Sequence, residues 1–145
     1  MAALGPEQSD VRWKQRFENL QRALRQLEAA VDAHAAMPSN ELMVIALIKA
    51  YEFCFELSWK TLKDLLAWNG IDAKLPRDVI KQAFATGLLE HGQLWIDMLE
   101  QRNLMTHTYD QTRAAAATRL ITDPYLAELQ WLRQSLIRRL EEEAP

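Results

Sequence analysis

The sequence predicts an all-α protein, an antiparallel up-and-down helical bundle with four main helices plus a short extra helix. Its four glycines and five prolines are far apart, and the stretches between them are rich in Ala, Leu, Glu, Gln, Lys and Arg. These residues favour helices. No stretch alternates strictly between apolar and polar residues, as a half-buried strand does. Long helices joined by short connections favour antiparallel packing.

Two long helices are predicted in the first half of the chain. The first covers about residues 9–36, with Ser9 as its N-cap. The second begins near Ser39 or Asn40 and ends at Asn69-Gly70, because glycine commonly follows the last turn of a helix. Apolar residues recur every three or four positions in both helices, which predicts a buried stripe on each. These residues are Trp13, Phe17, Leu20, Leu24, Leu27 and Val31 in the first helix, and Ile45, Ile48, Phe55, Trp59, Leu62 and Leu66 in the second.

The second half of the chain predicts shorter helices. One covers residues 76–87 and starts with a proline, which suits the first turn. Another covers about residues 93–105, and a third starts after the N-cap Asp110 and reaches residue 121. The Asp123-Pro124 pair then restarts or kinks the chain before a last helix.

Composition limits the class of protein. An apolar fraction of 49% with 26% charged residues is ordinary for a globular chain. The net charge of −3 gives no overall basic signature of nucleic-acid binding. A single cysteine, Cys54, rules out an internal disulfide framework. There is no secretory signal and no apolar run long enough for a membrane span, so we expect a cytoplasmic protein with no membrane association.

The expected domain organisation has three parts. Residues 1–9 form a flexible N-terminal extension, residues 10–140 form the helical bundle, and residues 141–145 form an acidic tail.

Candidate chemistry is concentrated in the segment from Arg102 to Asp110. A straight helix places Arg102 and His107 about 140° apart, so they share a site only if the helix ends between them. The arginine fork suits a phosphate, and a histidine that titrates near neutrality can move a proton. Asn103 can orient the substrate or the arginine. This set, with no metal-ligand cluster, suits metal-independent RNA cleavage, in which a symmetric dimer supplies a second histidine.

Structural roles for the same residues stay open on spacing alone. Arg102 can instead pair with Glu100 or Asp97, and the other polar residues of the segment can cap a helix or sit at the wet edge of a core. On the second helix, Glu52 and Glu56 either line a groove and hold Arg102 or Lys60, or are half-exposed helix charges.

A modest positive region lies between residues 60 and 81, where lysines and arginines outnumber acidic residues. It includes Lys60. These charges can contact RNA phosphates, although such charges are more often a solvated face. His34 and His91 are interpreted as surface residues.

The order of motifs along the chain carries a resemblance. Residues 52–66 (EFCFELSWKTLKDLL) are followed by residues 76–84 (PRDVIKQAF), by Trp95 and by residues 102–110 (RNLMTHTYD). Over about residues 10–140 this order resembles the nucleotidyltransferase substrate-binding protein family. That family belongs to the HEPN superfamily, which includes HepT-type toxins of toxin–antitoxin systems. Arg102, His107 and Tyr109 fill its R-x4-H-x-Y motif without substitution.

The resemblance implies a function and partners. It implies a homodimer with the motif at the dimer groove, and it makes Arg102 and His107 ribonuclease residues that act on an RNA substrate. Tyr109 would receive AMP from a partner minimal nucleotidyltransferase, which acts as antitoxin. We take Asn103, Lys60 and Glu56 as substrate-binding residues, and we expect neither a metal nor another cofactor. The alternative is a non-catalytic subunit that presents substrate to the nucleotidyltransferase.

Overall fold

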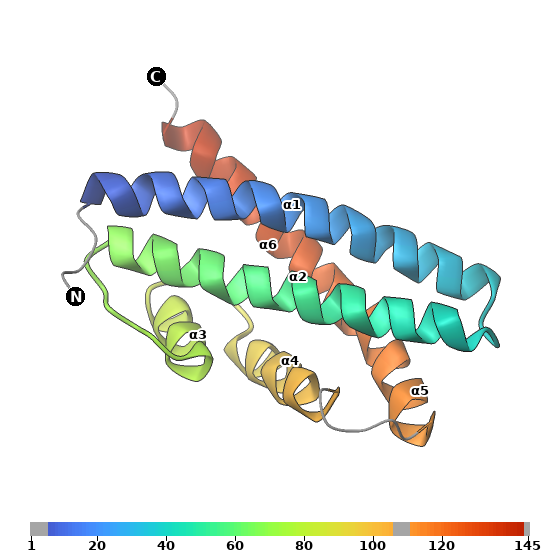
Figure 1. Ribbon diagram of the computed structural model, residues 1–145. Coiled ribbons are helices and arrows are strands. Elements are labelled where there is room, and N and C mark those ends of the chain that lie inside the picture. Colours follow the sequence, from blue (N-terminus) through green and yellow to red (C-terminus); the bar gives the residue numbers. More distant parts are fainter. Residues whose placement is uncertain (1–5, 106–110, 144–145) are drawn as a thin grey trace.

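Helices account for the regular structure of this chain. The computed structural model describes residues 6–105 and 111–143, and this part of the chain contains helices and no strand. The two longest, α1 (Pro6–Ala36) and α2 (Glu41–Trp68), lie side by side and antiparallel, as Figure 1 shows. The predicted all-α bundle is confirmed.

The α1–α2 hairpin follows directly from its sequence. The side chain of Asn40, the N-cap of α2, accepts hydrogen bonds from the backbone N–H groups of Leu42 and Met43. This is the capping role predicted near Ser39 or Asn40. Farther along, Arg16 of α1 donates to the buried carboxylate of Asp64 on α2 at 2.7 Å. Burial raises the pKa of Asp64 although Arg16 opposes that effect.

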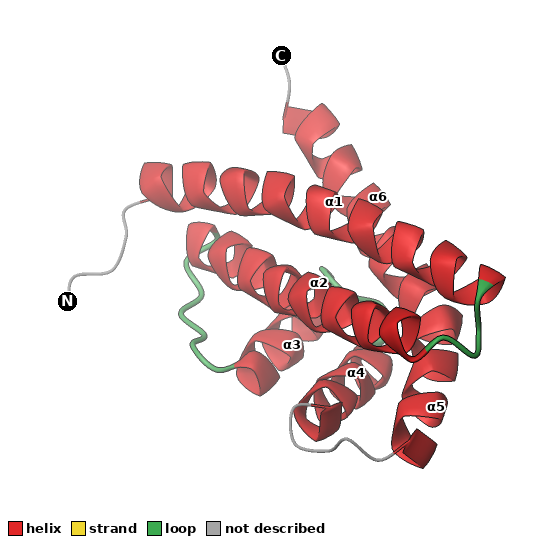
Figure 2. Ribbon diagram, turned by 45° about the vertical axis from the view of Figure 1, so that its right-hand side comes forward, coloured by secondary structure: helices red, strands yellow, loops and turns green. Residues whose placement is uncertain are grey.

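Two shorter helices cover one side of α2. They are α3 (Pro76–Ala85) and α4 (Gly92–Met105), and Figure 2 shows both next to α2. Gly70 and Gly87 follow α2 and α3 with φ of 83°. A side chain is strained in that conformation, which explains why glycine ends both helices.

The last part of the chain returns across the bundle. It comprises α5 (Gln111–Leu120), a wider turn η1 (Ile121–Tyr125) and α6 (Leu126–Glu143). The backbone of Asp123 is extended, with φ of −160° and ψ of 119°, so the predicted break at Asp123-Pro124 is confirmed. α6 contacts α1, where Arg133 binds Glu28 through two hydrogen bonds.

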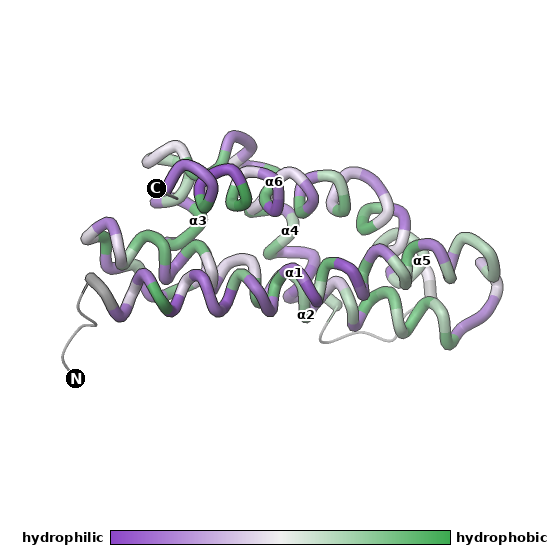
Figure 3. The backbone as a smooth tube through the Cα atoms, turned by 90° about the horizontal axis from the view of Figure 1, so that it is seen from above, coloured by the Kyte–Doolittle hydropathy of each residue, from purple (hydrophilic) through white to green (hydrophobic). Residues whose placement is uncertain are grey.

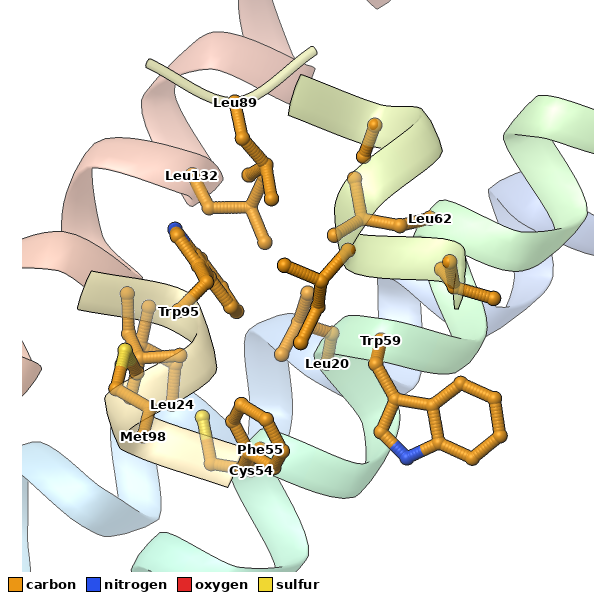
Figure 4. Packing of buried hydrophobic residues seen from close by; sticks show 14 of the residues in the cluster. Leu20, Leu24, Cys54, Phe55, Trp59, Leu62, Leu89, Trp95, Met98 and Leu132 are labelled. Carbon is orange, nitrogen blue, oxygen red and sulfur yellow. The ribbon is translucent and has the colours of Figure 1, made fainter. Parts of the chain in front are cut away.

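The core lies between α1, α2, α4 and α6. Figure 4 shows the ring of Trp95 from α4 among leucines of neighbouring helices, with Trp59 at the margin. Two buried polar contacts position α4. The Tyr51 hydroxyl of α2 donates to the carbonyl of Met98 at 2.7 Å, and the Trp95 indole N–H donates to Glu128 of α6 at 3.0 Å. These bonds satisfy groups that would otherwise be costly to bury.

Two details of the sequence interpretation need correction, and a third is confirmed with an added contact. α1 begins at Pro6, so Ser9 lies inside the helix and is buried instead of capping it. Ile45 points to solvent, because the apolar stripe of α2 is not buried at its N-terminal end. His91 is largely exposed, as predicted, but its ring contacts Glu128 at 3.2 Å.

Figure 3 shows hydrophilic and hydrophobic residues alternating along the helices, as expected where each has one buried and one exposed face.

Among the described residues, no helix combines the length and the apolar character that crossing a bilayer requires.

Candidate functional site

The predicted arginine lies at the last turn of α4 and faces α2. The Nη2 group of Arg102 donates to the Glu56 carboxylate across the two helices, and its Nη1 group donates to Asn103 Oδ1 at 2.8 Å. The side chain is partly buried, which limits its screening by water. The open alternatives for Arg102 are wrong: Glu100 pairs with Arg77, and Asp97 accepts a hydrogen bond from Gln93.

Glu56 connects the two cations of this cluster. Besides Arg102, it binds Lys60, one turn farther along α2, with 3.4 Å between Lys60 Nζ and Glu56 Oε1. Burial is the largest effect on Glu56 and opposes its ionisation, but the hydrogen bond from Arg102 and the charges of Arg102 and Lys60 act together against it, and the pKa of Glu56 is held below the usual value. The carboxylate is therefore charged at neutral pH and binds the guanidinium as an ion pair.

An open hollow of about 360 Å³ adjoins this ion pair. On one rim, Lys49 contacts Glu52 at 3.3 Å. Arg102 has five N–H donors, and the two bonds described above leave others for a ligand in the hollow. A phosphate there can bind the guanidinium through two nitrogens in a forked geometry, whereas the Glu56 carboxylate accepts from one nitrogen. The lining residues are Lys49, Glu52, Phe53, Glu56 and Arg102.

The structure brings together four of the six predicted site residues: Arg102, Asn103, Glu56 and Lys60. The other two, His107 and Tyr109, lie outside the described residues. Sequence reasoning missed Phe53 as a lining residue. Its spacing held a signal, because Phe53 follows Lys49 by four positions and precedes Glu56 by three, which places it on the polar face of α2.

A second hollow, of about 300 Å³, lies where the ends of α4 and α5 meet α2. Its lining is mostly apolar, with Gln101 and Arg113 as the long polar side chains. The lining residues are Ile48, Gln101, Leu104, Met105, Arg113, Ala114, Ala116 and Ala117.

The positive region predicted between residues 60 and 81 is partly neutralised. Arg77 pairs with Glu100 at 3.5 Å, and Lys74 lies 3.9 Å from Asp72. Of this region, Lys60 is the cation that contacts the Arg102 cluster. Within residues 6–105 and 111–143, no group of three or more His, Cys, Asp and Glu side chains is placed to hold a metal ion.

Comparisons with known proteins agree on one family. A family model described as nucleotidyltransferase substrate binding protein like matches residues 15–138. The chain is 31% identical over 105 residues to a Haemophilus influenzae protein named probable ribonuclease HepT, covering 69% of this chain and 71% of that protein.

Solved structures show the same bundle. A Haemophilus influenzae protein described as a substrate-binding domain of a nucleotidyltransferase has a TM-score of 0.70 and 28% identity, covering 83% of this chain and 98% of that one. A Thermus thermophilus protein has a TM-score of 0.66, with the same identity and coverage. A Shewanella oneidensis HEPN toxin, tri-AMPylated and in complex with its MNT antitoxin, has a TM-score of 0.72 at 10% identity over 87% of this chain and 96% of that one, a likeness of fold.

Proposed function

We propose that this chain, which belongs to the nucleotidyltransferase substrate-binding protein family of the HEPN superfamily, is the toxin of a toxin–antitoxin pair and cleaves RNA without a metal ion. The observation that carries the proposal is the Arg102 guanidinium, held by Glu56 at the edge of an open hollow five residues before His107. The resemblance of the chain to a protein named as a ribonuclease supports it.

In the proposed reaction, the ribose 2′-OH attacks the adjacent phosphorus and the 5′-oxygen of the next nucleotide leaves. The products are a 2′,3′-cyclic phosphate and a free 5′-hydroxyl. Arg102 binds the phosphate oxygens and stabilises the charge that grows on them in the transition state. His107 takes the proton from the 2′-OH or gives one to the leaving oxygen. Asn103 keeps the guanidinium in place, and Lys60 and Glu56 set the charge around the substrate.

One histidine cannot readily serve as base and acid at the same time, so the active species is a homodimer with two copies of the motif at one groove. Exposed apolar residues support a second copy against the N-terminal half of α2, since Leu42 and Ile45 both point to solvent there. Sedimentation of the wild type and of a Leu42→Ser, Ile45→Ser double variant tests this, with the variant expected to shift toward monomer.

Neutralisation proceeds through Tyr109. Its hydroxyl attacks the α-phosphate of ATP on the partner nucleotidyltransferase and releases pyrophosphate, which leaves AMP on the tyrosine. In this proposal, the added bulk and negative charge exclude RNA phosphate from the site. Intact mass after incubation with ATP and the partner is expected to rise by one or more AMP groups in the wild type and to stay unchanged in Tyr109→Phe.

The decisive experiment is RNA cleavage by the purified protein beside two matched histidine variants. His107→Ala is expected to lose cleavage. His34→Ala, which changes a histidine in the last turn of α1, is expected to cleave as the wild type does. Equal cleavage by the wild type and His107→Ala would refute the catalytic role.

The alternative function is a non-catalytic subunit that presents substrate to a nucleotidyltransferase. The description of the Haemophilus influenzae structure favours it. This alternative predicts a stable complex with the nucleotidyltransferase and no RNA cleavage by any form of the chain, so the same cleavage assay separates the two functions.

A further inference from the structure

A large aromatic side chain stands exposed on α2, in the middle of the site. Phe53 is 58% exposed, whereas the next two residues, Cys54 and Phe55, are fully buried. An exposed phenylalanine keeps apolar surface in water and gains nothing for the fold. Other large apolar side chains, Phe84 among them, are comparably exposed, so what distinguishes Phe53 is its place beside Arg102 at the hollow.

Phe53 shares its hollow with the proposed phosphate-binding group. Phe53 and Arg102 both line the 360 Å³ hollow, one from α2 and the other from α4. That volume is within the range of small-ligand sites. A ligand that binds Arg102 through a phosphate therefore has an aromatic surface within the same hollow.

The charges around the hollow suit a nucleic-acid strand better than an apolar partner. Lys49 and Lys60 lie on either side of Phe53 along α2, and Arg102 faces it from α4. Each cation is now paired with a glutamate of α2, Glu52 or Glu56. Phosphates of a bound strand can replace these carboxylates at the same cations. In the free protein, the glutamates therefore stand where we expect the phosphates to bind.

We infer that Phe53 is a stacking platform for an unpaired nucleobase next to the phosphate bound by Arg102, so that the substrate is single-stranded RNA. This inference rests on the proposed ribonuclease function. Proteins that bind single strands combine cationic contacts to phosphates with aromatic side chains on which bases stack. In a duplex the bases are stacked on one another and paired, so none is free to cover Phe53.

A division of labour follows from this arrangement. The Arg102 contact positions the strand but carries no sequence information. Stacking accepts any base, because every base has a π-face. The site therefore selects for single-stranded structure with little preference among bases at this position.

The test measures binding of a fluorescent single-stranded RNA by anisotropy, with 2′-O-methyl groups to prevent cleavage. Phe53→Ala is expected to weaken binding by about five- to hundredfold. Phe84→Ala is the matched control, because Phe84 is equally exposed, at 54%, but lies on α3 outside the hollow. Phe53→Trp is expected to bind at least as tightly as the wild type, and Phe53→Leu to bind as weakly as Phe53→Ala.

Two further arms locate the effect at a base. The wild type is expected to bind a duplex of the same sequence less tightly than the single strand. An oligonucleotide with consecutive abasic positions is expected to lose affinity for the wild type but to lose no more for Phe53→Ala, since the stacking contact is already absent.

Several results would overturn the inference. One is unchanged binding by Phe53→Ala, and another is wild-type affinity in Phe53→Leu, which would indicate apolar contact without stacking. A third is a loss of RNA binding that appears only together with a loss of the dimer in sedimentation, which would assign Phe53 to contact between copies. Binding that depends on Phe53 without any cleavage would refute the proposed ribonuclease and leave the stacking site standing.

Discussion

Two arginine–glutamate pairs in this bundle look alike but have different surroundings. Arg133 of α6 binds Glu28 of α1, with side chains that are 19% and 31% exposed. Arg102 of α4 binds Glu56 of α2, at 24% and 32%. In both pairs the glutamate pKa is lowered: the arginine hydrogen bond is the largest effect at Glu28, whereas burial is the largest at Glu56 and is exceeded only by the hydrogen bonds and nearby cations together.

The difference lies in how many donors of each arginine its glutamate takes up. We call a pair closed where the glutamate binds both terminal nitrogens and open where it binds one. Both nitrogens of the Arg133 fork bind both oxygens of Glu28, and Gln130 adds a third donor to the same carboxylate. Arg102 gives Glu56 one nitrogen and turns the other toward Asn103, at the edge of an open hollow. A closed pair joins two helices, whereas an open pair keeps donors available for a ligand. The type of ion pair alone therefore does not identify a site.

The largest expected effect is on the rate of RNA cleavage, which should depend on Arg102 and hardly at all on Arg133. Arg102→Ala is expected to lower kcat/KM for RNA cleavage by about a hundred- to thousandfold, the usual loss when a donor to a charged transition state is removed. Arg102→Lys should recover only part of it, because a lysine lacks the planar fork. Arg133→Ala should change kcat/KM little. A comparable loss in both alanine variants would contradict the distinction.

Stability is expected to rank the same variants in the opposite order. Arg133→Ala leaves Glu28 partly buried without its bidentate partner, so we expect the free energy of unfolding to fall by about 1–2 kcal/mol. Arg102→Ala should cost about 1 kcal/mol or less, because Lys60 still pairs with Glu56. Urea denaturation followed by circular dichroism measures both, and a larger loss in Arg102→Ala would reverse the comparison.

Both glutamates are expected to contribute to the dependence of the free energy of unfolding on pH. Each glutamate has a lower pKa in the folded chain than in the unfolded chain, so each stabilises the fold above its unfolded pKa. That contribution is lost as the pH falls through the folded pKa. Glu28→Gln and Glu56→Gln should each flatten the loss of stability between about pH 5 and 3 by about 1 kcal/mol or less. Unfolding measured across that range would contradict this if either variant steepened the loss.

The smallest effect uses the single thiol as a reporter. Burial raises the pKa of Cys54 to about 12, so alkylation of the native protein at pH 8 should be slow. Arg133→Ala should label several-fold faster, because weaker contact between α6 and α1 allows the bundle to open more often. Arg102→Ala should label close to the wild-type rate. Labelling followed by intact mass measures these rates, and faster labelling in Arg102→Ala alone would place the weak point at α4.

Much of the fold was predictable because its signals are local. The N-cap at Asn40, the glycines after α2 and α3, and the break at Asp123 each depend on a few neighbouring residues. The exposure of Ile45 was not predictable, because the stripe of α2 continues past the point where other helices cover it. Burial depends on which elements pack alongside, which a single helix does not record.

The candidate site was predictable only in part for the same reason. The residue types near Arg102 indicated phosphate chemistry, and Glu56 was one of four acidic residues considered as its partner, with Glu52, Asp97 and Glu100. The choice of Glu56 over Glu100 depends on how α4 lies against α2. His107 and Tyr109 stay predictions.

The hydrogen bond from Tyr51 to Met98 has a consequence for the chemistry. In an α-helix the carbonyl of residue 98 also accepts the backbone N–H of residue 102, so one oxygen joins the tyrosine of α2 to the turn that carries Arg102. The buried hydroxyl of Tyr51 thereby helps to fix where the last turn of α4, and with it Arg102, lies along α2. Tyr51→Phe would keep the ring and remove this hydrogen bond. The placement of the arginine on the surface therefore depends in part on a hydroxyl group in the interior of the protein.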